Sequence, residues 1–270
     1  HVQTYACRYS NYLDGSKRKI DWENSQHALD QKKIIARRAF LELTGSKQVV
    51  NLGIGTPEVI AEVAKEENQI DKLILTTEAG VHGGLPSGGL SFGTAVNTDA
   101  IISQNQQFDF YDGGGIHTAF LGMAQIDKMG NVNVSRFSGK LAGAGGFVNI
   151  SSSSKNIVFC GTFTSGGLLL QVEDGKINIL NEGEIIKFTN KVDQITFSGE
   201  RAETSGQSVK YVTERAVFEL KEGKIHLIEI APGIDLEKQI LEFMDFEPLI
   251  NKISIMDPRI FSSTSMMPAE

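Results

Sequence analysis

The sequence predicts an α/β fold with an open, mixed, partly parallel sheet and flanking helices. In the first half, short apolar runs break into glycine-rich loops and alternate with helical patterns, as in parallel strands joined by helices. After residue 118 strand patterns dominate, and Asp-Gly and Glu-Gly pairs indicate hairpin turns. We therefore expect a sheet that is parallel in its first half.

The first helix is expected over residues 31–43, with Asp30 as its N-cap. Its apolar residues Ile35, Ala39 and Leu43 recur at helical spacing and fall on one face. This periodicity predicts an amphipathic helix that packs on the sheet.

A strand, a glycine loop and a second helix follow. Residues 48–55 read as an apolar strand that breaks into glycines, and residues 56–66 read as a helix. Thr56 suits the cap, and Pro57 suits the first helical position. The next strand, residues 72–75, leads directly to Glu78 and a loop rich in glycine.

The second half is expected to consist mainly of strands and hairpins, closed by one helix. A hairpin with a Met-Gly-Asn turn is expected over residues 119–137, a buried strand over 155–163, hairpins over 167–180 and 210–231, and a helix over 235–246 capped by Asp235. The serine run 151–155 reads as a loop. No repeat is visible along the chain.

Composition excludes several classes of function. The 270-residue chain carries a net charge of -7 and has a pI near 5.4, which disfavours nucleic-acid and membrane-surface partners. No run approaches the ~20 apolar residues of a membrane helix, so a cytoplasmic or organelle-lumen protein is the default. Cys7 and Cys160 lack metal-ligand spacing and read as ordinary thiols, so we expect no metal site.

The position of Glu78 indicates a functional carboxylate. In open α/β sheets, ligands bind beyond the carboxyl ends of the strands, and Glu78 follows such an end. The glycines after it allow a ligand to approach the backbone closely. The alternative is a surface carboxylate in a turn, and this position by itself does not decide between the two.

The glycine loop 51–57, NLGIGTP, favours an anion. Backbone N–H groups are free where a strand ends and a helix begins, and the helix dipole adds positive charge there. The loop is not a dinucleotide fingerprint, because Glu58 stands where that pattern needs glycine. The glycine clusters at 112–117 and 142–149 are either similar sites or tight turns.

Four blocks in this order resemble the family I CoA-transferases. They are NLGIGTPE at 51–58, TTEAGVHGG at 76–84, LGMAQIDKMGNVNVS at 121–135 and AGAGGFVN at 142–149. The resemblance covers roughly residues 30 to 250 and is to the C-terminal, glutamate-bearing half of the single-chain short-chain enzymes, which act on acetate or acetoacetate. Ala79 stands where the dimeric ketoacid transferases have asparagine, which favours the single-chain subgroup.

The resemblance implies the fold, the domains and the site residues. The fold would be the CoA-transferase and ribose-phosphate-isomerase-like type, with residues 1–29 as an extended linker or remnant of a longer chain, 30–250 as the catalytic domain and 251–270 as a C-terminal tail. By motif match Glu78 is the nucleophile. The residues implied at the oxyanion and CoA are Asn51, Gly53, Ile54, Gly55, Gly145 and Gly146.

The implied reaction transfers CoA between a short-chain acyl-CoA and a free carboxylate through a glutamyl-CoA thioester. CoA is then substrate and covalent intermediate, and no prosthetic group or metal is required. The expected partners are acyl-CoA, short-chain carboxylates, an N-terminal half and further copies in a homo-oligomer. The alternatives are an acyl-CoA hydrolase, a non-catalytic binding module for acyl-CoA or a sugar phosphate, and a half that is inactive alone.

Four polar residues remain ambiguous. Thr118 and Gln125 are candidates for orienting acyl oxygens, although each also suits a bond to the backbone of its strand. The mechanism needs no proton shuttle, so a loop or packing role is the better interpretation of His82 and of His117.

Overall fold

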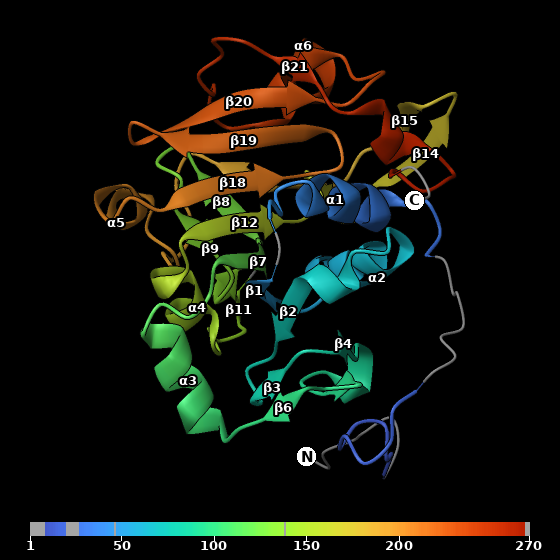
Figure 1. Cartoon of the computed structure of the whole chain (residues 1–270). Helices are drawn as coiled ribbons and strands as arrows, with labels where there is room; N and C mark the ends of the chain where they lie inside the picture. The colour runs from blue at the N-terminus through green and yellow to red at the C-terminus, as the bar shows by residue number, and fades with distance from the viewer. Residues whose placement is uncertain (1–8, 20–26, 46, 138, 268–270) are drawn as a thin grey trace.

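A ten-stranded mixed sheet organises the described part of the chain (Figure 1). The computed structural model describes residues 9–19, 27–45, 47–137 and 139–267. The strand order is β21-β20-β19-β18-β12-β7-β1-β2-β3-β6. The predicted α/β class with a mixed, partly parallel sheet is confirmed.

Five parallel strands form the centre of this sheet. They are β1 (Gln48–Leu52), β2 (Leu73–Thr76), β7 (Thr118–Gly122), β12 (Asn156–Cys160) and β18 (Ser208–Val212). Strands β7 and β12 are buried almost throughout, as in parallel sheets with both faces covered. Because the five strands run in the same direction, their carboxyl ends lie along one edge of the sheet.

Antiparallel strands extend both sides. Strands β19 (Ala216–Lys221) and β20 (Lys224–Ile230) continue from β18, and β21 (Ser254–Ile255) then pairs parallel to β20. On the other side β3 (Val81–His82) and β6 (Ala100–Ile101) add to β2. The parallel centre thus lies between margins that contain the antiparallel pairs.

Helices cover both faces of the sheet. Cys160 of β12 lies near Arg38 of α1 (Gln31–Phe40). The preceding residue, Phe159, stacks on Phe147 of α4 (Phe147–Ser153), with ring centroids 6.0 Å apart. Successive side chains of a strand point to opposite faces, so α1 and α4 lie on opposite sides of β12.

Two N-terminal helices lie side by side on the α1 face (Figure 1). The Asp30 carboxylate accepts a hydrogen bond from the amide of Lys33, which confirms the predicted cap. Helix α1 ends at Phe40, three residues before the predicted end, because the chain turns at Leu41. Helix α2 (Val59–Glu66) follows the 3-10 turn η1 (Thr56–Glu58).

The predicted Thr56 cap is wrong. Gly55 is the residue that precedes the 3-10 turn, and no side chain caps it. The backbone of Gly55 has φ 88°, a conformation that glycine adopts without strain.

Two helices on the α4 side were not predicted. Helix α3 (Gln104–Asp112) begins with a capping box formed by Ser103 and Gln106. The serine run predicted as a loop ends α4 instead, and the hydroxyls of Ser153 and Ser154 donate to carbonyls four residues earlier.

Two of the three predicted hairpins form where expected. In the third, predicted over 119–137, only β8 (Gln125–Asp127) and β9 (Val132–Asn133) pair as a hairpin, because the residues before them belong to β7 of the central sheet. Strands β14 (Leu169–Glu173) and β15 (Lys176–Asn181) join at Asp174-Gly175, with φ 49° and 71°. Strands β19 and β20 join at Glu222-Gly223, with φ 53° and 68°. Positive φ at both turn residues matches the twist of the strands, which accounts for these sequence pairs.

The remaining elements are short. The closing helix α6 (Leu236–Gln239) starts at the predicted Asp235 cap and is followed by the 3-10 turn η4 (Leu241–Phe243), so it is shorter than the predicted 235–246. The others are η2 (Ile70–Lys72), β4 (Leu85–Pro86), η3 (Gly89–Ser91), β5 (Ala95–Val96), β8 (Gln125–Asp127), β9 (Val132–Asn133), β10 (Arg136–Phe137), β11 (Lys140–Leu141), β13 (Thr164–Ser165), β16 (Ile185–Ile186), β17 (Phe188–Thr189), α5 (Gly199–Thr204) and η5 (Pro258–Phe261). In the described ranges no helix combines the length and the apolar composition needed to cross a bilayer.

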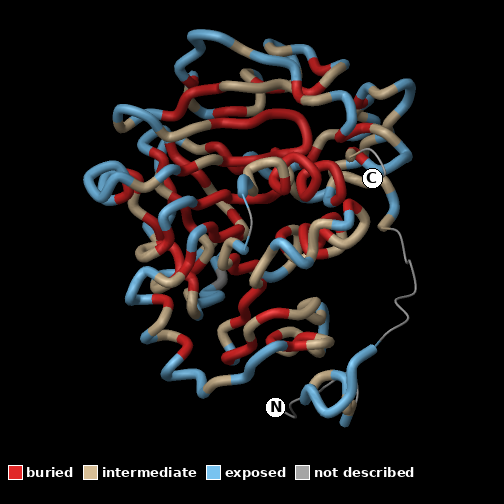
Figure 2. The backbone as a smooth tube through the Cα atoms, viewed as in Figure 1, coloured by how far each residue is buried: buried red, intermediate tan, exposed pale blue. Residues whose placement is uncertain are grey.

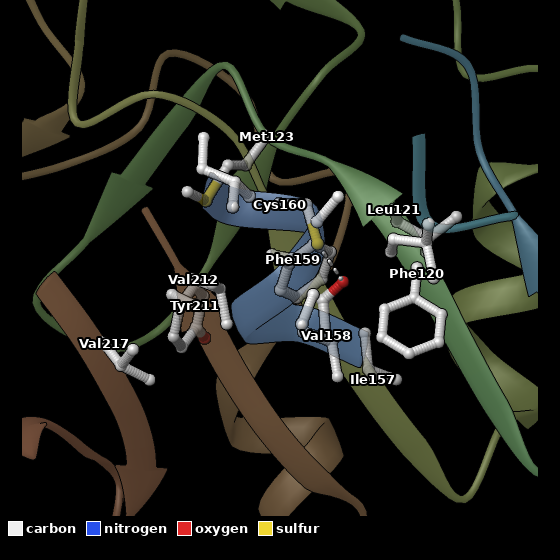
Figure 3. Close-up of a cluster of buried hydrophobic side chains, with 14 of the residues drawn as sticks. Phe120, Leu121, Met123, Ile157, Val158, Phe159, Cys160, Tyr211, Val212 and Val217 are labelled. Atoms are coloured by element: carbon white, nitrogen blue, oxygen red, sulfur yellow. Dashed lines mark hydrogen bonds between the residues drawn. The ribbon is translucent and has the colours of Figure 1, made fainter. Parts of the chain in front are cut away.

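Buried residues of the central strands form the core (Figure 2), and Figure 3 shows a cluster of their side chains. The Phe159 ring stacks on Tyr211 of β18 at 5.4 Å and meets Phe197 edge-on at 5.0 Å. These contacts join β12 to β18 and to the loop before α5. Cys160 is a buried free cysteine, and its burial raises the pKa of the thiol. Cys7 lies outside the described residues.

The segment after residue 250, predicted as a tail, packs on the helices. Ile260 and Phe261 are 0% and 2% exposed. The Arg37 guanidinium of α1 donates to the carbonyl oxygens of Ile260 and Thr264, at 3.2 and 2.8 Å. The Glu67 carboxylate accepts from the amides of 266 and 267 at 2.8 and 2.7 Å. The segment is thus fixed from both helices.

If this packing supports the fold, Ile260→Ala will lower the free energy of unfolding by about 2–5 kcal/mol, since it leaves a cavity in a closed environment. Ile255→Ala is the matched control in the same segment, because Ile255 is 59% exposed; its effect should stay within about 0.5 kcal/mol. Urea unfolding measures both. Equal effects would show that the segment does not contribute to the core.

Candidate active site

The ends of β1 and β2 bring the predicted nucleophile to the carboxyl edge of the sheet. Glu78 lies in the turn after β2. A Cβ built on Gly146, the residue before α4, would lie 3.2 Å from Cγ of Glu78 and 3.0 Å from Cζ of Phe108. The fold therefore brings Glu78 and Gly146 together across about 70 residues of sequence, and a side chain at position 146 would press on Glu78 and Phe108.

Backbone bonds fix the turn that carries Glu78. The amide of Thr77 donates to the carbonyl of Val81, and the amide of Gly80 donates to the carbonyl of Thr77, both at 3.1 Å. The Thr77 hydroxyl donates to the carbonyl of Gly93 at 2.8 Å. Gly80 has φ 104°, and a Cβ there would overlap the carbonyl oxygen of Ile102. The turn is thus closed on two sides by neighbouring backbone.

The Glu78 carboxylate is desolvated, and one of its two oxygens has no hydrogen-bond partner among the described residues. The residue is half-buried, and among the described residues its Oε2 is buried without a hydrogen-bond partner. Burial raises the pKa of Glu78, and a bond from its own backbone amide partly offsets this rise. An unpaired buried carboxylate lowers stability, so its presence at a strand end is typical of a functional group.

A buried hydrogen-bond network lies at the ends of the two strands. The Asn51 side-chain amide donates to the Tyr111 hydroxyl at 3.1 Å and to the carbonyl of Thr76 at 3.4 Å. The Tyr111 hydroxyl in turn donates to Thr76 Oγ1 at 3.0 Å. Burial, with a smaller effect of the Glu78 charge, raises the pKa of Tyr111. The network ties β1, β2 and α3 together immediately before Glu78.

Sequence reasoning missed Tyr111 and Phe108 at this site, because the segment before the triple glycine was not recognised as a helix. The Ser103 and Gln106 capping box was the available signal. The predicted Asn51 is 0% exposed, and its Oδ1 has no partner in the described part of the chain. Asn51 thus combines a structural amide with a free buried acceptor.

The two histidines are engaged within the fold. Nε2 of His82 lies 2.5 Å from Oε1 of Gln107, and its ring meets Phe110 edge-on at 5.3 Å. Nδ1 of His117 accepts from the amide of Val49 at 3.2 Å. Both imidazoles therefore bridge α3 or β1 to neighbouring segments.

The predicted glycine loop forms the rim of the site. Ile54 is 68% exposed, and no atom lies within 4 Å of the Cβ position at Gly55 or at Gly145. The amide of Gly53 donates to the carbonyl of Phe120 at 2.8 Å, so it is not free for a ligand. The open positions are therefore Gly55, Gly145 and the Ile54 side chain.

Thr118 and Gln125 lie elsewhere. Thr118 is the first residue of β7, so it lies at the amino end of that strand, opposite the edge that carries Glu78. Its side chain is buried, with 1% exposed. The Gln125 side chain bonds to Asn133 at 2.6 Å and to Asp193 at 3.1 Å. Their role in substrate binding stays a prediction. In the described ranges no cluster of His, Cys, Asp and Glu has the arrangement of a metal site.

Two known proteins are similar in sequence to this chain over most of its length. No family model matches it. It is 49% identical over 239 residues to the acetate CoA-transferase YdiF of Escherichia coli K12, a match over 88% of this chain and 45% of the relative. It is 45% identical over 266 residues to the caffeate CoA-transferase of Acetobacterium woodii, over 96% of this chain and 50% of the relative.

A solved structure matches the fold closely. The crystal structure of an acyl-CoA transferase (YdiF) of E. coli O157:H7 in a thioester complex with CoA superposes with a TM-score of 0.88 at 43% identity, over 98% of this chain and 49% of that one. The chain therefore spans about half the length of the relatives that it matches.

The Gly80 contact makes a steric prediction. Gly80→Ala should lower the free energy of unfolding clearly more than Gly89→Ala. Both glycines have positive φ, 104° and 59°, which costs an alanine roughly 1–2 kcal/mol, but only Gly80 faces a backbone oxygen. Chemical denaturation of both variants checks this. A Gly80→Ala chain as stable as the Gly89→Ala chain would contradict the packing of the turn.

The buried carboxylate makes a pH prediction. The folded-state pKa of Glu78 is raised, so its ionisation destabilises the fold as pH rises from the ordinary value of about 4.3 through the folded pKa. Glu78→Gln should therefore be more stable than the parent at pH 7, and the difference should shrink as pH falls toward 4. Unfolding at several pH values measures it, with the exposed Glu247→Gln as control. A gain that is independent of pH, or a loss, would contradict a raised pKa.

Proposed function

The chain belongs to family I of the CoA-transferases, and on that premise we propose that it transfers CoA between a short-chain acyl-CoA and a free carboxylate with Glu78 as the nucleophile. The observation that carries this proposal is the unpaired, half-buried Glu78 carboxylate beside Gly146 at the end of β2. An ionised carboxylate needs no base to become a nucleophile.

The reaction proceeds by two exchanges at the same carboxylate. An oxygen of Glu78 attacks the thioester carbonyl, the C–S bond breaks, and CoA leaves as a thiolate from an acyl-glutamyl anhydride. The thiolate then attacks the glutamyl carbonyl, which releases the first acid and leaves a glutamyl-CoA thioester. The acceptor carboxylate repeats these steps in reverse, so atoms and charges balance without an added cofactor.

Each attack passes through a tetrahedral oxyanion that needs hydrogen-bond donors. The amide of Gly146 and the amides of the loop at Ile54 and Gly55 are our candidates. Removal of one such donor typically costs about 3–4 kcal/mol of transition-state stabilisation. Asn51 contributes by fixing the ends of β1 and β2, since its amide bonds to Tyr111 and to the Thr76 carbonyl.

The substrate class follows the relatives at a coarse level. One relative is an acetate CoA-transferase and another a caffeate CoA-transferase; for this chain we propose a short-chain acid of the acetate or acetoacetate type. Because the chain spans about half of those relatives, we propose that it works with an N-terminal half. We further propose that it acts as a homo-oligomer in the cytoplasm. CoA enters as substrate and covalent intermediate.

Intact-mass measurement tests the nucleophile. The chain is incubated with acetyl-CoA, and the adduct is trapped by borohydride reduction. We expect a gain of the mass of CoA less water before reduction in the parent, and no gain in Glu78→Gln. The control is Glu58→Gln, because Glu58 is also half-buried and has a buried oxygen, Oε1, that has no partner in the described ranges.

The control separates chemistry from burial. The Glu58→Gln chain should form the adduct as the parent does, since Glu58 precedes α2 and does not follow β2. An adduct on Glu78→Gln would refute the assignment. So would a parent that gains no mass although CoA raises its melting temperature.

A further inference from the structure

A hollow opens on the same edge of the sheet as Glu78, beyond the ends of β7 and β12. Its volume is about 310 Å³, and its lining includes Ile54, Gly122, Cys160 and Lys187. Ile54 belongs to the rim loop of the Glu78 site, so this loop borders both places. The proposed chemistry assigns no role to Lys187 or to the crevice.

Lys187 is a buried cation with spare donors. It is 5% exposed, and in the described part of the chain it forms no ion pair. Its Nζ donates one hydrogen bond, to the carbonyl of Thr162 at 2.8 Å. An ammonium has three donors, and a buried charge is normally paired or bound to a ligand. Lys187 therefore has capacity for an anion in the crevice.

The surroundings leave room for this ammonium. A Cβ on Gly161 would lie 2.8 Å from Nζ of Lys187, so the glycine makes space for the charged group. Burial lowers the pKa of Lys187 to about 8, and the Glu214 charge opposes that shift. The Glu214 carboxylate is itself occupied by Arg215 at 2.7 Å and by the amide of Phe163 at 2.9 Å. The positive charge of Lys187 is thus incompletely neutralised by the fold.

The distance from Glu78 decides what kind of anion fits. Strands β12, β7, β1 and β2 are consecutive neighbours, and neighbouring strands lie about 4.8 Å apart. The end of β12 is therefore roughly 14 Å from the end of β2. A short acyl group held at Glu78 does not reach that far. CoA does, because its phosphates lie at the far end of the pantetheine arm from the sulfur.

We propose that the crevice binds the phosphate end of CoA, with Lys187 Nζ as its buried cationic donor, while the arm passes over Ile54 toward Glu78. This inference rests on the proposed function for the identity of the ligand. The phosphate oxygens accept hydrogen bonds from the two N–H groups of Lys187 that do not bond to Thr162. Gly161, which has no side chain, leaves space for the ammonium beside the end of strand β12.

Equilibrium binding tests the site without the chemistry. CoA and pantetheine, which lacks the phosphates and the nucleotide, are titrated calorimetrically into the Glu78→Gln chain. Adding Lys187→Met should raise the Kd of CoA roughly ten- to hundred-fold, the range for a lost charge-assisted hydrogen bond, and leave pantetheine unchanged. Lys187→Arg keeps the charge and should retain most of the affinity. Gly161→Ala should weaken CoA in the same selective way.

Lys252→Met is the matched control, because Lys252 is exposed and does not line the crevice. It should leave both affinities unchanged. Equal losses for CoA and pantetheine in Lys187→Met would assign Lys187 a structural role and overturn the inference. Unchanged CoA affinity, or no CoA binding to the Glu78→Gln chain, would also overturn it. If Lys187→Met weakens CoA binding selectively but the parent chain forms no glutamyl adduct with acetyl-CoA, the phosphate site stands and only the assignment of the nucleophile is refuted.

Discussion

An unpaired carboxylate at the end of a buried strand is the constraint on which the rest of the site depends. Glu78 is held by the backbone of its turn, because Thr77 and Gly80 bond to neighbouring carbonyls while Oε2 has no partner in the described ranges. A partner for that oxygen would stabilise the fold and lower the reactivity of the carboxylate. The fold therefore fixes the position of Glu78 and leaves one carboxylate oxygen available to react.

The surrounding structure offsets the cost of that arrangement. Asn51 and Tyr111 fix the strand ends before the turn, and the aromatic cluster around Phe159 joins the sheet to α4 and β18. The start of helix α4 then brings Gly146 against Glu78, where a larger residue would press on Glu78 and Phe108. The same edge of the sheet continues past Ile54 to the crevice that Lys187 lines, so the Glu78 carboxylate and a buried cation both lie along this edge.

Local patterns made much of this predictable. The Asp30 cap, strands β1 and β2 and both hairpins follow from short-range rules of capping, periodicity and turn conformation. Glu78 was identifiable because an apolar strand ends at a carboxylate followed by glycines, and because the four blocks match a family in order. These signals lie within a few residues of one another.

The rest depends on contacts between distant segments. Helix α3 is rich in polar and aromatic residues, so its periodicity is weak, and only tertiary packing places Tyr111 between Asn51 and Thr76. The serine run ends a helix whose buried residues Phe147 and Ile150 lie in the hydrophobic core, a contact that the serines themselves do not reveal. Nothing in the residues around Lys187 reveals that it is buried, since that burial comes from β12 and the loop after it.

Isotope transfer during turnover tests the central claim most directly. In the proposed mechanism the acceptor carboxylate supplies the bridging oxygen of the anhydride, and that oxygen stays on Glu78 when CoA takes the acyl group. The chain, with acetyl-CoA and acetate labelled with ¹⁸O, should therefore incorporate ¹⁸O into the peptide that contains Glu78, as peptide mass spectrometry would show. CoA transfer without label in that peptide, or with label on another residue, would contradict the account.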